Sequence, residues 1–479
     1  ADPGRASPSP DAPKRVAVLP LEAIGDDIRL GPIAAGLTDE LIVHLAGVEP
    51  ERLHLVAPAS VRRAHAEDAS IQSIAERLDA GFVLAGALQL EGDRLRVAAR
   101  LVRAEDETVM WTTGLDRRLG SLLDVQRALA ARLGDALRRE LLGDARDDGA
   151  LTAADAVGPK AYEHFLRARH FLAQQTPAGL TNAGVELRRA LEIEPGFADA
   201  WATLAYTRAQ VGIYDLERPR DVFPRAERAV ERALALDPEN DDALVARAMI
   251  DGAFHWQSDD AVAALRRVLD RSPNHVGALR LLGLWLQAQG RDAEAQATFE
   301  AARRLDPLSL TLQSTIGWGH YLAGRTERAV EQARAVLDLD SNYLVAWDDL
   351  KWFYITLGRE PEAAHAFLRV VELEGEADAV PGLRALYNER GLRGLLEASL
   401  EHQLERAAAE EYHSPYDVAI VLAAVGRVEE ALDWLERSFD EREVDMLALA
   451  SDPRLAAVRG EARYRTLLDR FRDAPRATP

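Results

Sequence analysis

Residues 276–309 read VGALRLLGLWLQAQGRDAEAQATFEAARRLDPLS, and this stretch decides the fold of most of the chain. Apolar residues recur three and four positions apart on both sides of Gly290-Arg291, which predicts two amphipathic helices joined by a short turn. Glycine suits this turn because it adopts the left-handed conformation at a helix C-terminus. Pro307 ends the second helix, because the residue before a proline is disfavoured in the helical conformation. The stretch is therefore expected to form a pair of antiparallel helices.

The same phrase recurs at a nearly constant interval. Its closing prolines are Pro195, Pro238, Pro273 and Pro307. They are 43, 35 and 34 residues apart, and two phrases without proline follow at intervals of 34. Ala295, Ala329 and Ala363 hold equivalent positions, where a small side chain lets the paired helices approach closely. Together with Leu282-Gly283 and Phe299, these positions resemble the tetratricopeptide repeat (TPR), whose period is 34 residues. The resemblance implies an all-α superhelical solenoid.

The array is predicted to cover residues 160–440. A divergent first pair occupies Tyr162–Pro195, and the unit with the 43-residue interval carries nine extra residues around Ile213–Pro224, which we expect to form a lobe on its first helix or turn. Residues 382–409 are expected to form a helix pair without the consensus, which returns in 417–438. Residues 441–479 are predicted to form capping helices and a tail, because a solenoid needs a polar-faced terminal unit.

Residues 15–143 alternate between strand-like and helix-like patterns. We predict the order β-α-β-α-β-β-β-α, a mixed sheet covered by helices, so the whole chain is an α+β domain followed by the all-α solenoid. The predicted strands are 16–19, 53–56, 82–90, 95–102 and 108–115, and the predicted helices are 33–45, 70–78 and 121–142. Ser70 is expected to cap its helix, and Trp111 to be half-buried core rather than a ligand-binding aromatic.

The first helix of this domain carries Thr38, Asp39 and Glu40 between two apolar positions. Such a group is either an acidic site or the solvated face of an amphipathic helix. Charge runs on helices are most often solvated, so we expect these side chains to face water.

Seven short segments of this domain occur in an order that points to one bacterial family. They are Val16–Pro20, Gly36–Ile42, Ala80–Gly86, Gly92–Val97, Trp111, Asp116-Arg117 and Leu123–Gln126. They resemble the TolB amino-terminal-like domain, which is related to FlgO- and CsgG-type domains. After a predicted linker at 144–159, the phrase Ala161–Arg169 and the ending Asp452–Leu455 extend the resemblance to proteins that join such a domain to TPRs.

In many of those relatives the pair follows a winged-helix DNA-binding domain, as in CadC-like regulators, or a Ser/Thr kinase or an adenylate cyclase. A membrane helix commonly lies between them. The resemblance therefore implies an upstream effector domain in a longer protein and favours a periplasmic or extracytoplasmic location, with a cytoplasmic one left open.

Composition excludes several classes of function. With 58 Lys and Arg against 79 Asp and Glu, the net charge is −21 and the pI about 5.1, so no basic face is expected for nucleic acid. The absence of cysteine excludes disulfides, thiolate metal sites and a cysteine nucleophile. No apolar run approaches the roughly 20 residues of a membrane-spanning helix, so no direct membrane insertion is expected. Residues 1–14, rich in Pro, Ser and Ala, are predicted to be a disordered linker or tag.

No catalytic or cofactor-binding motif is found. A phosphate-binding loop needs a lysine after glycine, and all three lysines follow other residues. Signatures of kinases, zinc proteases, serine hydrolases and calcium loops are missing. His164 and His170 are six residues apart, which places them on different helical faces. We therefore predict no catalytic, cofactor or metal site, and we expect the carboxylates of the array to be solvated.

The candidate site is the concave surface formed by the first helix of each repeat. The period places on it Tyr206, Met249, Arg280, Leu284, Trp318, Tyr321, Trp352 and Ile355. An aromatic-lined groove suits an extended or helical peptide, so the predicted partner is a protein or peptide. The alternative for each residue is a place in the core between repeats. The groove lacks the Lys/Asn cluster with which other TPRs clamp a terminal carboxylate.

These features favour a non-enzymatic interaction or sensory module. The family resemblance implies that it is the C-terminal regulatory part of a membrane-anchored signalling protein or transcriptional regulator. Two alternatives stay open. One is a stand-alone scaffold for cell-envelope assembly or secretion, and the other is an enzyme with an unrecognised carboxylate site.

Overall fold

The computed structural model describes residues 13–25, 27, 29–68, 70–92, 94–118, 122–143, 157–174, 176–408 and 412–474. The predicted tail (1–14) and linker (144–159) lie mostly outside these residues. Lys14, assigned to the tail, begins strand β1, and Pro159, assigned to the linker, begins helix α5. Both boundaries are corrected accordingly.

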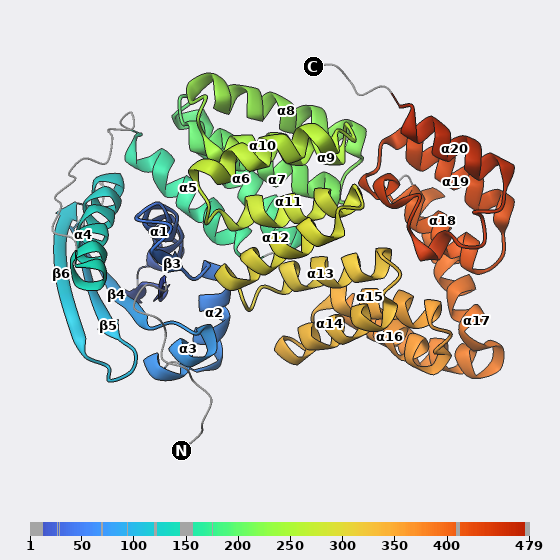
Figure 1. The fold of residues 1–479 in the computed structure, drawn as a ribbon, viewed down its shortest axis with the longest axis horizontal. Helices are drawn as coiled ribbons and strands as arrows, with labels where there is room; N and C mark the ends of the chain where they lie inside the picture. The colour runs from blue at the N-terminus through green and yellow to red at the C-terminus, as the bar shows by residue number, and fades with distance from the viewer. Residues whose placement is uncertain are drawn as a thin grey trace.

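Among the described residues, the N-terminal domain is built on a six-stranded mixed sheet (Figure 1). Its strands are β1 (Lys14–Val18), β2 (Glu22–Ile24), β3 (Leu53–Leu55), β4 (Phe82–Glu91), β5 (Arg94–Arg103) and β6 (Val109–Arg118). The order is β3-β1-β4-β5-β6, with β2 beside β4. Strand β1 pairs in parallel with β3 and β4, and β2 pairs in parallel with β4, whereas β4, β5 and β6 form an antiparallel meander. The mixed sheet is confirmed, and β2 is an addition, because its three exposed residues carry no buried-strand pattern.

Helices cover both faces of this sheet. They are α1 (Leu30–Ala46), α2 (Pro58–Glu67), α3 (Ile71–Leu78) and α4 (Leu122–Leu142). Alternate residues of β1 point to opposite sides: Val16 packs with α1 and α4, and Ala17 packs with α2 and α3. Ser70 caps α3 as predicted, its Oγ accepting a hydrogen bond from the Ser73 amide at 3.4 Å. Helix α2 was not predicted, because few of its residues are apolar and buried.

The rest of the chain is an array of helix pairs. Its helices are α5 (Pro159–Leu172), α6 (Pro177–Ile193), α7 (Ala198–Ile213), α8 (Pro219–Leu236), α9 (Asp241–Ala253), α10 (Ser258–Arg271), α11 (Val276–Ala288), α12 (Asp292–Leu305), α13 (Leu310–Leu322), α14 (Thr326–Leu339), α15 (Leu344–Thr356), α16 (Glu360–Leu373), α17 (Val380–Ala408), α18 (Pro415–Ala424), α19 (Val428–Glu441) and α20 (Ala462–Arg472). Short 3₁₀ helices lie between α16 and α17, at η2 (Ala377–Ala379), and between α19 and α20, at η3 (Val444–Ala448) and η4 (Pro453–Leu455). The predicted all-α solenoid is confirmed.

The repeat geometry follows the sequence period closely. Helices α11, α13 and α15 begin at residues 276, 310 and 344, and their partners begin at 292, 326 and 360, so each pair is offset by 34 residues. Gly290 and Gly324 have φ of 72° and 73°, the left-handed conformation predicted for the turn within each pair. Residues 382–408 form two helical segments broken at Gly391, where φ is 65°. The nine extra residues near Ile213–Pro224 form no separate lobe, because they mostly lengthen α7 and α8 to 16 and 18 residues.

The N-terminal domain is packed against the array at two places. Helix α1 lies along α5, and one continuous apolar core runs from the sheet into the first repeats. Further along, α2 and the loop before it contact later repeats: the Ser60 Oγ donates to Asp306 Oδ1 at 2.5 Å, and the Ala57 amide donates to the Leu305 carbonyl at 2.8 Å. The domain is therefore fixed to both the start and the middle of the array.

The prediction that Thr38, Asp39 and Glu40 face water is wrong. Only 4%, 5% and 9% of their surfaces are exposed. The Thr38 hydroxyl accepts from the Leu21 amide at 3.0 Å, Asp39 pairs with Arg62 of α2 at 2.6 Å, and Glu40 pairs with Arg169 of α5 at 3.2 Å. The apolar stripe of α1 faces the sheet, and α2 and α5 cover its other face. A charged side chain can stay there because each one is paired.

Candidate interaction site on the inner face of the array

The array has an inner face, on which helices several repeats apart meet. The Arg280 Nη2 of α11 lies 3.5 Å from the Tyr206 hydroxyl of α7, two helix pairs earlier. Tyr214 and Tyr343 are also close enough to interact electrostatically with Arg280. Side chains from repeats that are not neighbours can meet only on the inside of a curved stack. We use the term inner face for the surface that carries Tyr206, Tyr214, Arg280 and Tyr343, together with the residues described in the next three paragraphs.

The C-terminal helices close this curve. The Trp256 Nε1, just after α9, donates to the Glu443 carbonyl at 3.2 Å, and its ring lies 4.9 Å from that of Phe471. The Arg442 Nε donates to the Phe254 carbonyl at 3.4 Å. Figure 1 shows α19 and α20 beside the end of α9. Arg220 of α8 also donates to the Asp440 carbonyl. The last helices therefore contact the second and third helix pairs, and the stack closes on itself.

Arg454 of η4 occupies the aromatic part of the inner face. Its guanidinium lies 4.7 Å from the ring centre of Trp318 and 5.7 Å from those of Trp352 and Tyr416. Three hydrogen bonds, of 3.0, 2.9 and 2.7 Å, hold it against the fully buried carboxylate of Asp452. The two tryptophans predicted to line a groove thus already hold a cation from the same chain.

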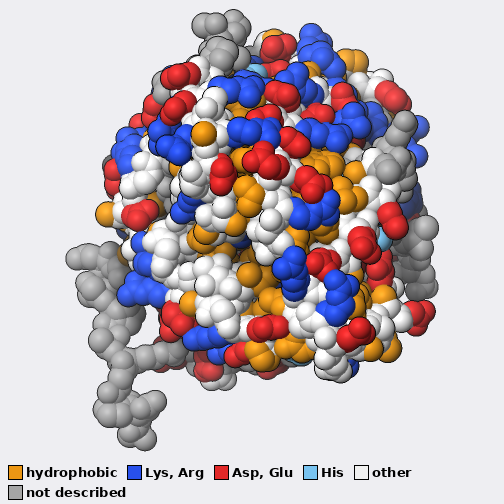
Figure 2. All heavy atoms as spheres, turned by 90° about the vertical axis from the view of Figure 1, so that its right-hand side faces the viewer, with side chains coloured by type: hydrophobic (Ala, Val, Ile, Leu, Met, Phe, Trp, Pro, Cys, Tyr) orange, Lys and Arg blue, Asp and Glu red, His pale blue; other side chains and the backbone are white. Residues whose placement is uncertain are grey.

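A cleft of about 460 Å³ opens beside Arg454, between the ends of α15 and α18, the second segment of α17 and η4. Its lining is mostly apolar, and it includes Trp352, Ile355, Leu392 and Leu396 together with Arg393 at the edge. Figure 2, which faces the C-terminal side of the molecule, shows hydrophobic side chains gathered in the middle of that face with charged ones around them. Such a cleft suits an apolar side chain of a bound segment.

Carboxylates crowd the place where the curve closes. The Tyr412 hydroxyl donates to Glu443 at 2.8 Å and lies 3.5 Å from Asp215, and Asp445 and Asp417 interact electrostatically with these groups. Burial, and then repulsion from the neighbouring carboxylates, raises the pKa of Asp215 well above its usual range. Burial likewise raises the pKa of Glu443 and of Asp445 to about 7. The expectation of solvated carboxylates in the array is therefore wrong here.

Stability is expected to fall as pH rises through the range in which these carboxylates lose their protons. A carboxyl group with a raised pKa binds its proton more tightly in the folded than in the unfolded chain, so folding is favoured at low pH and this advantage is lost between about pH 4 and pH 7. Urea titrations at a series of pH values should show a loss on the order of 2–4 kcal/mol between about pH 5 and pH 8.

The variant Asp445→Asn should flatten this fall, because one repelling charge is removed. Asp469→Asn, at an exposed position of α20, should leave it unchanged. Glu40, whose burial raises its pKa to about 7, titrates in both proteins and cancels in the comparison. An equal pH dependence in wild type and Asp445→Asn would contradict the assignment.

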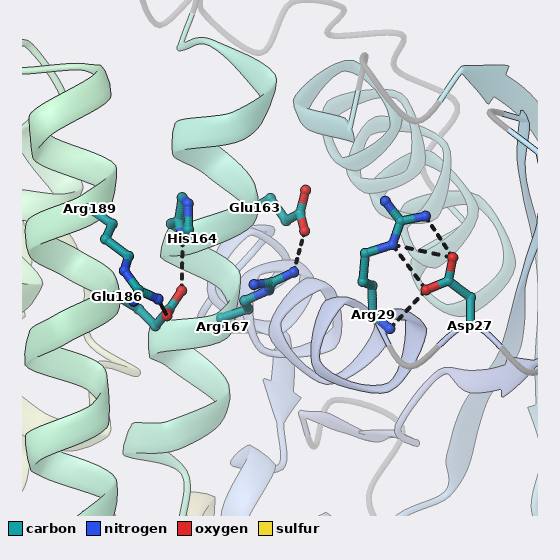
Figure 3. Close-up of polar contacts among 7 residues, drawn as sticks. All are labelled: Asp27, Arg29, Glu163, His164, Arg167, Glu186 and Arg189. Carbon is teal, nitrogen blue, oxygen red and sulfur yellow. Dashed lines mark hydrogen bonds and ion pairs between the residues drawn. The ribbon is translucent and has the colours of Figure 1, made fainter.

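A second polar cluster marks the junction between the two domains. Figure 3 shows pairs in a row from α6 across α5 to the start of α1: Glu186 with His164 at 2.7 Å and with Arg189, then Glu163 with Arg167, then Asp27 with Arg29. Most of these pairs are local and partly exposed, so each contributes little to stability. They give no constellation of reactive groups, and we assign them a structural role.

The structure separates the predicted groove residues into three groups. Tyr206, Arg280, Leu284 and Trp318 are half-buried, and Ile355 lines the cleft. Met249 and Tyr321 are buried, with 1% and 0% exposed, so their assignment to the groove surface is corrected. Both pack between repeats, and Tyr321 is further fixed by a 2.7 Å hydrogen bond with Thr356. Trp352 is 4% exposed, because Arg454 and its neighbours cover it.

Sequence reasoning missed Arg454, Tyr214 and Tyr343 as inner-face residues. The phrase Asp452–Leu455 signalled a terminal cap, and its arginine was not connected with the tryptophans more than 100 positions earlier. Tyr214 and Tyr343 flank helices instead of lying within them, so the helical period does not reveal which way they point.

Within the described part of the chain, no three His, Cys, Asp or Glu side chains are arranged to hold a metal ion. None of the helices described there combines the length and apolar character that crossing a bilayer requires.

Comparison with known families places the first domain near a class of regulators. Residues 12–132 match the family model of the second domain of HilA/YgeH-like transcriptional regulators. Over 202 residues, the chain is 28% identical to a putative adenylate cyclase 3 from Rhizobium meliloti (strain 1021). This covers 42% of the chain, which spans about a third (34%) of that relative's length. The resemblance of the first domain to TolB stays a prediction.

Several solved helical-repeat proteins overlap with the array. Human IFIT1, solved as a dimer with m7Gppp-AAAA, is 15% identical, with a TM-score of 0.44 over 67% of this chain and 78% of its own. YrrB, described as a TPR protein with an unusual peptide-binding site, is 20% identical, with a TM-score of 0.25 over 39% of this chain and 89% of its own. At such scores the overlaps carry no inference about ligands, which is drawn below from the residues of this chain.

Proposed function

We propose that this chain is a non-enzymatic regulatory module whose array binds a segment of a partner protein. The observation that carries the proposal is the inner face, where an apolar cleft opens beside a tryptophan pair on a closed stack of helix pairs. The match of residues 12–132 to a regulator domain supports a role in signalling or transcriptional control.

The geometry favours a protein segment over a small metabolite. Cleft and tryptophans are built from α13, α15, α17, α18 and η4, so the surface extends over several helices instead of enclosing one ligand. Its charged lining residues are Arg454, which is paired with Asp452, and Arg393, which is paired with Glu397, so both already have a carboxylate partner in this chain. In such a surface, apolar anchors of a peptide give affinity and the polar rim gives direction.

The test is a binding experiment in which the cleft is blocked from outside. Ala424, the last residue of α18, is exposed and lines the cleft, so Ala424→Glu fills it without touching the core. Peptides selected from a random display library on the wild-type protein should bind this variant at least about tenfold more weakly, because a desolvated anchor contributes more than about 1.4 kcal/mol.

Ala288→Glu is the matched control, because Ala288 is likewise the exposed last residue of a first helix, α11, and does not line the cleft. It should bind the selected peptides as wild type does. Failure to select any peptide, or equal binding by the two variants, would reject the cleft as a docking site. Thermal unfolding of both variants checks that they are folded.

A further inference from the structure

Among the described residues, Arg280 of the inner face has no carboxylate partner. Its one hydrogen bond among the described residues is the long 3.5 Å contact with the Tyr206 hydroxyl, and no ion pair of the described residues includes it. Three other arginines of the interior have carboxylate partners: Arg169 pairs with Glu40, Arg62 with Asp39 and Arg454 with Asp452. A half-buried charge without a counter-charge is unfavourable, so its retention calls for an explanation.

The surroundings of Arg280 are polar and come from separate repeats. Tyr206 belongs to α7, Tyr214 follows α7, and Tyr343 precedes α15. Burial alone would lower the pKa of Arg280, but the three tyrosine hydroxyls outweigh it and raise this pKa. Arg280 is itself half-buried, so part of its side chain is reached by solvent. It thus presents a guanidinium beside a tyrosine hydroxyl, and no carboxylate of the described residues is paired with it.

We infer that Arg280, with the neighbouring Tyr206 hydroxyl, binds the side-chain carboxylate of an Asp or Glu in the protein segment that occupies the inner face. This rests on the proposed function and names one chemical requirement of the partner. A guanidinium offers two parallel N–H donors that match the two oxygens of a carboxylate, and tyrosine hydroxyls can donate to the same oxygens. An arginine left unpaired in the free protein would then be paired in the complex.

Charge favours a peptide over a nucleic acid as the source of the anion. The chain carries a net charge of −21. A polyanion would therefore be repelled by the protein as a whole. A peptide segment can instead carry a single acidic residue, which would pair with Arg280. Its apolar or basic neighbours would then contact the aromatic and acidic residues of the surface.

A double-mutant cycle tests this inference. Peptides selected by display on the wild-type protein are made N-acetylated and C-amidated, each acidic residue is changed to its amide, and binding is measured to wild type and to Arg280→Gln. At one acidic position the change should weaken binding to wild type by about tenfold or more, and by less than about twofold to Arg280→Gln, since a desolvated charge pair couples by about 1.5 kcal/mol or more.

Arg334→Gln is the matched control. Arg334 also donates to a tyrosine hydroxyl, that of Tyr354 at 3.1 Å, but it is exposed and lies on α14, a second helix. With this variant, changing the acidic residue of the peptide to its amide should weaken binding as much as it does with wild type. Equal losses in wild type and Arg280→Gln, selected peptides without an acidic residue, or a requirement for a free C-terminal carboxylate would each overturn the inference while leaving the proposed function standing. Selection of no peptide at all would overturn both.

Discussion

Replacing Gly36 by alanine is expected to force helix α1 away from helix α5 and to destabilise the junction of the two domains. A Cβ at this position would lie 2.5 Å from the Leu166 carbonyl oxygen and 2.9 Å from its Cα. These are backbone atoms of a helix, so no side-chain rotation can relieve the overlap. Overpacking of a core usually costs about 1–3 kcal/mol, and a contact with backbone is expected to reach the upper end of this range.

The effect should extend to the buried ion pair of the same junction. Gly36 and Glu40 are four residues apart and lie on the same face of α1. A shift of α1 would therefore lengthen the 3.2 Å contact between Glu40 and Arg169 and leave a buried carboxylate poorly paired. Hydrogen exchange should show faster opening of α1 and α5 than of α14, and urea unfolding should begin at lower concentration.

Gly31→Ala is the control for this experiment. Gly31 lies on the same helix and is exposed, and a Cβ added to it would have no neighbouring atom within 4 Å. Alanine is the better helix former, so this variant should be stabilised by up to about 1 kcal/mol. Opposite signs for the two variants would show that α1 and α5 are in close contact in solution. Two variants of equal stability would contradict that contact.

The same junction shows how far the sequence alone leads. The apolar spacing from Ile33 to Leu45 predicted helix α1 and the face that it turns to the sheet. It could not predict that a second face is covered, because the covering helix α5 lies more than 100 residues further on and its approach has no local signal. The charged residues Asp39 and Glu40 were therefore predicted to face solvent. In the fold they form ion pairs with arginines of α2 and α5.

The features of the array likewise divide into local ones, which the sequence predicts, and long-range ones, which it does not. The 34-residue period predicted the helix pairs and their glycine turns, because each of these depends on residues a few positions apart. The closure of the stack depends on Trp256 meeting Phe471 and on Tyr412 lying near Asp215, about 200 positions apart. The period predicted an inner-face position for Trp318 and Trp352, but it did not reveal that Arg454 lies against both rings.

Arg454→Ala is expected to give the largest loss of stability in the C-terminal part of the array. The side chain of Asp452 is completely buried, and that of Arg454 is 7% exposed. Removing the guanidinium leaves the carboxylate in place with the Tyr416 hydroxyl at 3.1 Å and the backbone amide of residue 454. Breaking a buried pair by removing one partner typically costs about 3–5 kcal/mol. Urea unfolding followed by tryptophan fluorescence measures the loss, since Trp318 and Trp352 lose their cation at the same time.

Two further variants separate the lost charge from the lost ring contacts. Arg437→Ala removes an exposed arginine that lies 4.9 Å from the Trp434 ring centre, and it should cost no more than about 1 kcal/mol, because a solvated cation over a ring contributes little. Adding Asp452→Asn to Arg454→Ala should recover part of the loss, because no buried charge then remains unpaired. If the double variant were no more stable than Arg454→Ala, the ring contacts rather than the carboxylate would hold η4 in the groove.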